Sequence, residues 1–283
     1  MSAQTRNFVK MHGLGNDFVI FDGRRDGFAL EPAAAAAVAD RHFGVGCDQV
    51  ITLLPSARAD LYMRIQNPDG SEAGACGNAT RCVANLIFDA DGGERMTIET
   101  KNGVLPCRRE ADGRITVDMG APKLEWREIP LARAMDTLDV EFTIQSPAGF
   151  TLAAPVAVNM GNPHAVFFVA NADAIDLAAV GPMIEHDPLF PERVNVSVAE
   201  VKNRELIRLR VWERGAGITL ACGSAACAVT VAATRRGIID GHATVIMDGG
   251  ALDMRWAEDG HVLMTGPAAL SFRGAWALHG GGR

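Results

Sequence analysis

Two four-residue stretches decide how this chain of 283 residues is interpreted: Ala221-Cys222-Gly223-Ser224 and Ala75-Cys76-Gly77-Asn78. In each, a cysteine and a glycine stand directly before an apolar run that predicts a helix. The first turn of a helix leaves backbone N–H groups without partners, and the helix dipole adds partial positive charge there. Such surroundings lower the pKa of a thiol, so the pattern predicts two reactive cysteines. A single cysteine before a helix is more often a small buried apolar residue, and the hypothesis therefore depends on the pair.

The pair belongs to an internal repeat, because Cys76 and Cys222 lie 146 positions apart and this offset recurs. The other landmarks that share it are Gly15-Asn16 with Gly161-Asn162, Gln49-Val50 with Asn195-Val196, Arg64-Ile65 with Arg210-Val211, Asn102-Gly103 with Asp248-Gly249, and Gly120 with Gly266. A long period repeated twice predicts two similar domains, since solenoid repeats span only about 20–50 residues. We expect an N-terminal domain over residues 1–122 and a C-terminal domain over residues 123–283, whose C-terminal tail can pack back on the first.

Each half is predicted to contain mostly strands and one central helix, over residues 77–89 and 223–236. Alternating apolar and polar residues at 61–66 are typical of a half-buried strand, and Asn102-Gly103 favours a type I′ hairpin turn. A proline followed by alanines predicts another helix over residues 32–43. The fold class is therefore α+β, with a sheet wrapped around a central helix in each half.

Composition excludes several classes of function. The net charge of −7 argues against a nucleic-acid partner. No apolar run approaches the roughly 18 residues of a membrane span, and no secretory signal is visible, so we expect a cytoplasmic protein without a membrane partner. The six cysteines are scattered without metal-ligand spacing, and no phosphate-binding loop is present. We therefore expect no metal and no cofactor.

Four motifs together resemble those of the diaminopimelate epimerases, in the same order and spacing. They are Met-His-Gly-Leu-Gly-Asn-Asp at 11–17, Ala-Cys-Gly-Asn at 75–78, Met-Gly-Asn-Pro-His at 160–164 and Glu-Arg-Gly-Ala-Gly at 213–217. The resemblance implies cofactor-independent interconversion of LL- and meso-2,6-diaminopimelate, a small-molecule substrate used in lysine and peptidoglycan precursor synthesis. It also implies a homodimer and two barrel-like, mostly antiparallel domains related by pseudo-twofold symmetry, with the site in the cleft between them.

The resemblance also implies roles for individual residues. Cys76 and Cys222 are the two acid/base groups, and His164 and Glu213 are the supporting catalytic positions. The implied substrate contacts are Asn16, Gln49, Asn67, Gly77, Asn78, Asn162, Asn195, Glu213, Arg214, Gly223 and Ser224. Five positions depart from the family pattern. Ile218 stands where glutamate is frequent, Ala79 and Ala225 where glycine is common, Ser224 where threonine is common, and Phe272 where a tyrosine is linked to dimer packing.

Inversion of a carbon next to a carboxylate needs a base on one face and an acid on the other, which a thiolate and a thiol supply. Arg214 and three asparagines suit the second, zwitterionic end of diaminopimelate. Two alternatives stay open at this point. One is a proline- or hydroxyproline-type racemase or epimerase, which would share the paired cysteines. The other is a thiol redox protein in which Cys76 and Cys222 form a disulfide.

Overall fold

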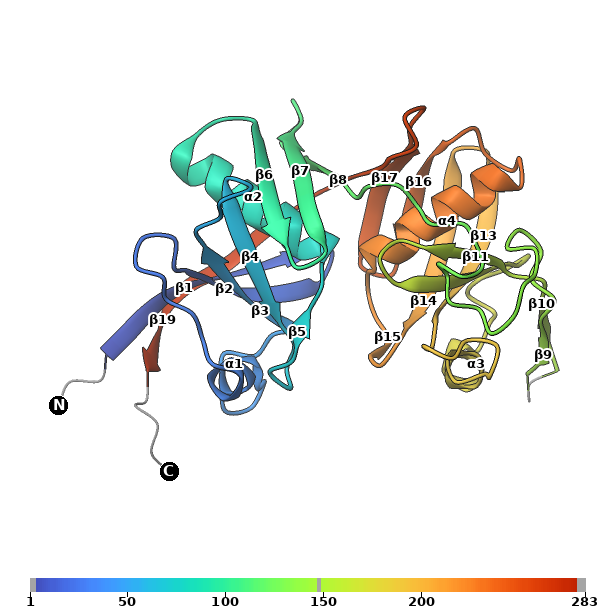
Figure 1. The fold of residues 1–283 in the computed structure, drawn as a ribbon, viewed down its shortest axis with the longest axis horizontal. Helices are drawn as coiled ribbons and strands as arrows, with labels where there is room; N and C mark the ends of the chain where they lie inside the picture. Colours follow the sequence, from blue (N-terminus) through green and yellow to red (C-terminus); the bar gives the residue numbers. More distant parts are fainter. Residues whose placement is uncertain (1–3, 147–148, 279–283) are drawn as a thin grey trace. The chain divides into compact units, whose positions relative to one another are not determined.

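The computed structural model describes residues 4–146 and 149–278, and the chain divides into two compact units (Figure 1). Unit 2 is Asp118–Gly266, and unit 1 is the rest of the described chain on either side of it. The last strand, β19 (Ala269–Leu278), belongs to unit 1, where it pairs with β1 (Gln4–Gly13). The two strands are antiparallel, and Leu278 lies opposite Gln4. The sequence predicted a boundary at residues 122 and 123, whereas the compact units meet at residues 117 and 118.

Unit 1 is a sheet in the order β19-β1-β2-β3-β4-β6-β7-β8, with the short β5 paired to β4. Its remaining strands are β2 (Asn16–Asp22), β3 (Gln49–Leu54), β4 (Leu61–Gln66), β5 (Glu72–Ala73), β6 (Arg95–Thr100), β7 (Gly103–Arg109) and β8 (Ile115–Asp118). The pairs β2–β3 and β4–β6 are parallel, and the others are antiparallel.

Unit 2 repeats this plan in the order β11-β12-β13-β14-β16-β17-β18, with β15 paired to β14. Its strands are β11 (Val156–Asn159), β12 (Pro163–Phe168), β13 (Asn195–Asn203), β14 (Leu206–Glu213), β15 (Gly217–Ile218), β16 (His242–Met247), β17 (Gly250–Trp256) and β18 (Val262–Gly266). A separate hairpin consists of β9 (Thr143–Gln145) and β10 (Thr151–Ala153). The parallel pairs β12–β13 and β14–β16 occupy the same places as in unit 1.

Strand register shows that the two units are copies of one fold. Phe18 lies opposite Gln49 in unit 1, and His164 lies opposite Asn195 in unit 2, so both partners are displaced by 146 positions. The next antiparallel pairs, β3–β4 and β13–β14, keep the same displacement. The predicted duplication of an α+β domain is therefore confirmed.

One landmark of the predicted repeat is displaced. The hairpin β6–β7 closes with Thr100 opposite Gly103, and its counterpart β16–β17 closes 147 positions further on. The predicted match of residues 102–103 with 248–249 is therefore wrong by one position. The predicted type I′ turn is also wrong, because positive φ is needed at both central residues and instead occurs at Gly103, with φ 138°, after the turn.

The central helices begin where the sequence predicted. Helix α2 (Gly77–Asp91) starts after Cys76 and α4 (Gly223–Arg235) after Cys222, and both cysteines are N-cap residues with extended backbone, φ −151° and −126°. Helix α4 packs against the strands of its own unit from β11 to β14 and from β16 to β18. Its body is built of alanine, cysteine, valine and threonine, and residues 225–233 are all buried. Small side chains let the sheet approach the helix closely on every side.

The described chain also contains helices α1 and α3, which are separate from the two central helices. Helix α1 (Pro32–Ala39) is shorter than the predicted helix over residues 32–43. The carboxylate of Asp40 accepts the backbone N–H groups of His42 and Phe43, both at 2.7 Å, and this local turn replaces further helix. Helix α3 (Leu177–Glu185) packs on an apolar cluster of unit 2 and contacts β14.

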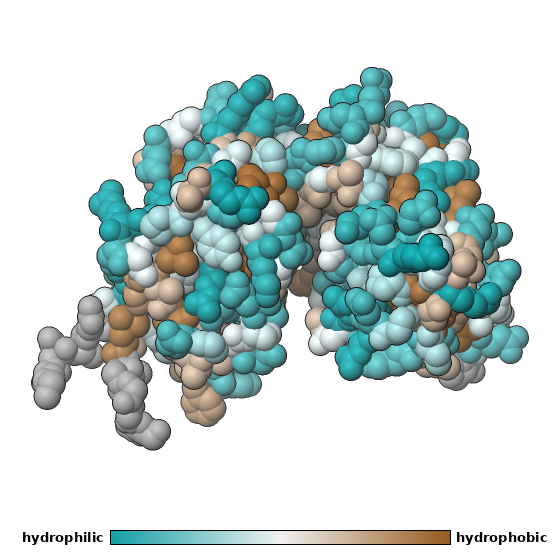
Figure 2. Space-filling view, viewed as in Figure 1, coloured by the Kyte–Doolittle hydropathy of each residue, from teal (hydrophilic) through white to brown (hydrophobic). Residues whose placement is uncertain are grey.

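Hydrophilic residues cover most of the face shown in Figure 2, and hydrophobic residues form separate patches on it. Within the described ranges, none of the helices combines the length and hydrophobicity that crossing a bilayer requires.

Replacing Gly181 in α3 by alanine should destabilise the protein, although alanine is the better helix former by about 1 kcal/mol. A Cβ at this position would lie 2.5 Å from Cγ and Cδ2 of Trp212. Overpacking of this kind typically costs about 1–3 kcal/mol, so we expect a net loss of unfolding free energy of roughly 1 kcal/mol in urea titrations. In a Trp212→Ala background the same Gly181→Ala change should be neutral or stabilising; a persistent loss there would show that ring contact is not the cause.

Candidate functional site

The first half-site lies at the start of α2 in unit 1. Cys76 is partly exposed, and its carbonyl oxygen accepts hydrogen bonds from Thr80 N and Thr80 Oγ1, both at 2.9 Å. These bonds fix the backbone of Cys76 as the helix N-cap while its side chain makes no capping hydrogen bond. The sulfur is therefore held beside the first-turn N–H groups of the helix, where negative charge is stabilised.

Amide side chains connect this cysteine with the strand ends around it. The thiol of Cys76 donates to Oδ1 of Asn16 at 3.8 Å, and Nδ2 of Asn78 donates to the same oxygen at 3.1 Å. Nδ2 of Asn16 donates in turn to Oδ2 of Asp48 at 2.8 Å. Three residues that the sequence predicted for the site, Cys76, Asn16 and Asn78, are thus in direct contact.

Two further predicted residues form a second contact in the same unit. Nε2 of Gln49, at the start of β3, donates to Oδ1 of Asn67 at 3.0 Å, and Nδ2 of Asn67 donates to Oγ of Ser71 at 3.1 Å. Oε1 of Gln49 is buried and has no hydrogen-bond partner among the described residues. This pair therefore offers a ligand an unused acceptor.

The second half-site lies at the start of α4 in unit 2. Cys222 is only 5% exposed, and its sulfur lies 3.4 Å from Oγ of Ser224. Burial, and then the charge of the nearby Glu213 carboxylate, raise the pKa of Cys222 well above its usual value. The opposing hydrogen bonds from Ser224 and from the backbone N–H of Ala225 are weaker. The lowered thiol pKa predicted from the helix start is therefore wrong for Cys222, which is a protonated thiol beside a carboxylate.

His164 is also governed by burial. It is fully buried, and burial together with the charge of Arg214 lowers its pKa to about 3, so the ring is neutral. Nε2 lies 3.0 Å from Oδ1 of Asn162. Since that oxygen is an acceptor, the proton sits on Nε2 and the lone pair on Nδ1, which has no partner in the described parts of the chain. This histidine can accept a hydrogen bond or a proton through Nδ1.

Asn195 holds two segments of the second half-site together. Its Nδ2 donates to the carbonyl of Pro163 at 2.8 Å, and its Oδ1 accepts the backbone N–H of Arg214 at 2.9 Å. The guanidinium of Arg214 donates to the carbonyl of Glu192 at 2.9 Å. Both ends of the Asn195 amide are thus occupied by protein groups, which aligns the segment before His164 with the loop that carries Glu213 and Arg214.

Sequence reasoning missed Glu185, the last residue of α3. Its carboxylate is 3% exposed and accepts Trp212 Nε1 at 2.7 Å and the backbone N–H of Gly215 at 2.9 Å. Arg193 Nη1 lies 3.7 Å away. Glu185 therefore holds both sides of the loop that contains Glu213. The sequence feature that could have indicated a role for Glu185 is that it is the one charged residue in the otherwise apolar sequence of α3.

Sequence reasoning also missed a cluster of charged side chains next to Asn16. Asp17 and Asp48 bridge to Arg41 at 2.8 Å each, and Lys10 Nζ lies 2.6 Å from Asp17. Burial raises the pKa of Asp17, but hydrogen bonds from Arg41, Lys10 and the backbone of Asp48 outweigh it and lower the pKa to about 2. The sequence feature that could have indicated this cluster is an aspartate directly next to each of the predicted residues Asn16 and Gln49.

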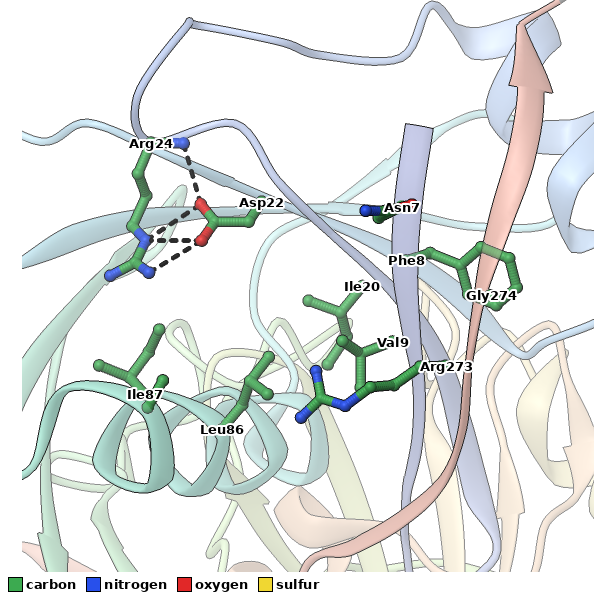
Figure 3. Close-up of a pocket in the computed structure, with 11 residues that line it drawn as sticks. Asn7, Phe8, Val9, Ile20, Asp22, Arg24, Leu86, Ile87, Arg273 and Gly274 are labelled. Carbon is green, nitrogen blue, oxygen red and sulfur yellow. Dashed lines mark hydrogen bonds and ion pairs between the residues drawn. The ribbon is translucent and has the colours of Figure 1, made fainter. Parts of the chain in front are cut away.

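One cavity of the protein lies apart from both half-sites. It has a volume of about 530 Å³ and lies in unit 1 between α2 and the strands β1, β2 and β19 (Figure 3). Val9, Ile20 and Leu86 line it, together with Arg24 and Arg273, and no predicted site residue does. In the described ranges, no group of three or more histidine, cysteine or acidic side chains is arranged to hold a metal.

Replacing Glu185 by glutamine should destabilise the loop that carries Glu213. One of the two N–H donors to this buried carboxylate, on Trp212 or Gly215, would then face an NH₂ group and lose a charge-assisted hydrogen bond, at a cost of about 1–3 kcal/mol. We expect lower stability in urea and faster amide exchange at Gly215. Glu192→Gln, the same change at an exposed position, is the control; equal effects of both variants would contradict this role of Glu185.

Comparison with known proteins identifies the family of the chain. The family profile described as Diaminopimelate epimerase matches residues 8–125 and 156–271. A diaminopimelate epimerase of Rhodospirillum centenum is 58% identical over 272 residues, which cover 95% of this chain and 91% of the relative. Another, from Acidiphilium cryptum, is 52% identical over 275 residues, covering 96% of each chain.

Solved structures share the fold at low sequence identity. A phenazine biosynthesis protein of the PhzF family from Bacillus anthracis has a TM-score of 0.69 at 18% identity, covering 97% of this chain and all of that one. A hydroxyproline epimerase from Agrobacterium vitis has a TM-score of 0.69 at 14% identity, covering 98% and 93%. With the profile matching most of its length and relatives more than half identical over nearly all of it, the chain belongs to the diaminopimelate epimerase family.

Proposed function

We propose that this protein is an isomerase that interconverts LL-2,6-diaminopimelate and meso-2,6-diaminopimelate by proton transfer between two cysteines and the substrate, without a cofactor. The observation that carries the proposal is the equivalent position of Cys76 and Cys222, each the N-cap of the central helix in two copies of one fold. Membership of the diaminopimelate epimerase family supports the substrate.

In the proposed reaction, both half-sites act on one substrate molecule. The thiolate of Cys76 takes the proton from the L-configured α-carbon, so a C–H bond breaks, an S–H bond forms and the electron pair stays on carbon. The thiol of Cys222 then gives its proton to the opposite face and becomes a thiolate. The reverse reaction starts from this form of the enzyme, with Cys222 as the thiolate and Cys76 as the thiol. In the substrate-free protein Cys222 is protonated, and the carboxylate of Glu213 beside it is the proposed acceptor when that thiol loses its proton.

The helix starts have a second proposed role. Their backbone N–H groups stabilise the substrate carboxylate next to the carbanion, where negative charge accumulates. His164 supports catalysis through Nδ1, the ring nitrogen that has no partner in the described chain. The proposed substrate contacts are Asn16, Gln49, Asn67, Gly77, Asn78, Asn162, Asn195, Glu213, Arg214, Gly223 and Ser224.

The alternatives have less support. The hydroxyproline epimerase from Agrobacterium vitis is only 14% identical to this chain, and that likeness concerns the fold alone. The thiol redox alternative has no support from the family match, which describes an epimerase. We place the enzyme in the cytoplasm, in the synthesis of lysine and peptidoglycan precursors.

We further propose a homodimer that forms through β19. Phe272 and Leu270 lie two residues apart on this strand and are 49% and 52% exposed, which is unusual for large apolar side chains. The Phe272 ring packs against Phe8, with the two centroids 6.0 Å apart, and so presents a fixed apolar surface. Such a surface favours contact with a second copy of the chain.

The two-cysteine mechanism predicts that Cys76→Ala and Cys222→Ala each abolish epimerisation but keep different partial reactions. The remaining thiolate still exchanges the proton of the isomer presented to it, because only one face has lost its group. Incubation of each isomer in heavy water, followed by mass spectrometry and chiral separation, measures both outcomes. Each variant should incorporate deuterium with one stereoisomer only, and full turnover by either variant would refute the mechanism.

The dimer hypothesis predicts that Phe272→Asp shifts the protein to a monomer in sedimentation velocity experiments, because a charge would be buried at the interface. Arg273→Asp is the matched control, since Arg273 is exposed and, in regular register next to Phe272, its side chain points to the opposite face of β19. An unchanged sedimentation coefficient for Phe272→Asp, or equal dissociation by both variants, would exclude β19 as the interface.

A further inference from the structure

Asp48 is the residue on which the orientation of Asn16 depends. Its Oδ2 accepts Nδ2 of Asn16 at 2.8 Å and the backbone N–H of Asp17 at 3.1 Å, and its Oδ1 accepts Nη2 of Arg41 at 2.8 Å. All three partners are donors, and a carboxylate can only accept. The NH₂ end of the Asn16 amide must therefore face Asp48.

The other end of the same amide then has one possible direction. Oδ1 of Asn16 faces the sulfur of Cys76 at 3.8 Å and Nδ2 of Asn78 at 3.1 Å. A carbonyl oxygen beside sulfur accepts an S–H bond but repels a thiolate, so this orientation stabilises the protonated thiol. If the amide turned over, its N–H groups would stabilise the thiolate instead.

The second unit does not contain this arrangement. The residue 146 positions after Asp48 is Val194, which is fully buried, and the counterpart of Asn16 is Asn162, whose Oδ1 contacts His164. Of the two half-sites, the one with Cys76 therefore has a carboxylate that accepts a hydrogen bond from the asparagine amide, and the equivalent position in the other is an apolar residue. The duplicated backbone carries different side-chain chemistry in its two copies.

We propose that Asp48 is a positioning residue that holds the Asn16 carbonyl oxygen toward the Cys76 thiol and so provides the acceptor for the S–H group formed when Cys76 takes a proton. The inference rests on the proposed role of Cys76, and it adds a residue that the family motifs did not indicate. Asp48 acts through Asn16 and does not itself touch the sulfur.

Charged neighbours hold the carboxylates around Asn16 in position. Lys10 and Arg41 flank Asp17 at 2.6 and 2.8 Å, and the lowered pKa of Asp17, about 2, keeps its carboxylate ionised. Cys47 lies on the same segment, and burial raises its pKa to about 11, so it adds no charge at neutral pH. Helix α2 adds two ionisable groups close to Cys76: Arg81, whose Nε donates to the carbonyl of Pro267, and Cys82, whose pKa burial raises to about 12.

The test measures how the alkylation rate of Cys76 depends on pH, by iodoacetamide labelling and mass spectrometry of the Cys76 peptide in the substrate-free protein. Asp48→Ala removes the acceptor and frees the amide to turn, so the midpoint of the profile should move to lower pH by about half a unit, a roughly threefold faster reaction below the midpoint. Asp48→Asn keeps an acceptor oxygen for Asn16 while losing the charge, and should leave the midpoint near that of the unmodified protein.

Two further variants complete the design. In an Asn16→Ala background, Asp48→Ala should no longer move the midpoint, because the amide that carries the effect is gone. Asp112→Ala, in an exposed turn where the carboxylate pairs with Arg114, controls for loss of a surface charge. The proposal is overturned by an unchanged midpoint in Asp48→Ala, by equal shifts in Asp48→Ala and Asp48→Asn, or by a shift that survives Asn16→Ala. Because no substrate is present, these outcomes do not depend on diaminopimelate being the substrate.

Discussion

The structure of both half-sites depends on one constraint, the start of a helix buried within its own sheet. At Cys76 and at Cys222 the chain changes from extended to helical backbone at one residue, which leaves first-turn N–H groups without intrahelical partners. Burying such groups is costly unless a polar or anionic partner is present. The fold thus forms two equivalent sites where backbone N–H groups favour an anion. The N-cap cysteine of each helix lies next to one of these sites.

The relative size of two electrostatic effects decides the state of the ionisable groups. A helix dipole contributes about 0.3–2 kcal/mol, whereas full burial can shift a pKa by several units, at about 1.4 kcal/mol each. Burial therefore dominates in unit 2, where it keeps Cys222 protonated and His164 neutral. A buried thiol beside Glu213 is suited to donate a proton, which the helix start alone would not have indicated.

Side-chain amides give the half-sites their geometry, and their orientation follows from what faces them. The acceptor-only carboxylate of Asp48 orients Asn16, and a backbone N–H together with a backbone carbonyl orients Asn195. Glu185 adds a buried carboxylate that accepts two N–H groups of the loop after β14. The duplication preserved strand register, but each copy acquired its own partners for these polar groups.

The sequence alone determined the features that short-range physics controls. The helix starts at Cys76 and Cys222, the strand β4 and the duplicated fold could be predicted, because caps, turns and alternation act within a few residues. The end of α1 could not, since the Asp40 carboxylate competes with the helix for backbone N–H groups. Only the tertiary structure decided the pairing of β1 with β19, the contact of Asp48 with Asn16 and the contact of Glu185 with Gly215. Those contacts join residues from 30 to more than 250 positions apart, and they form only once strand register and burial have brought the elements together.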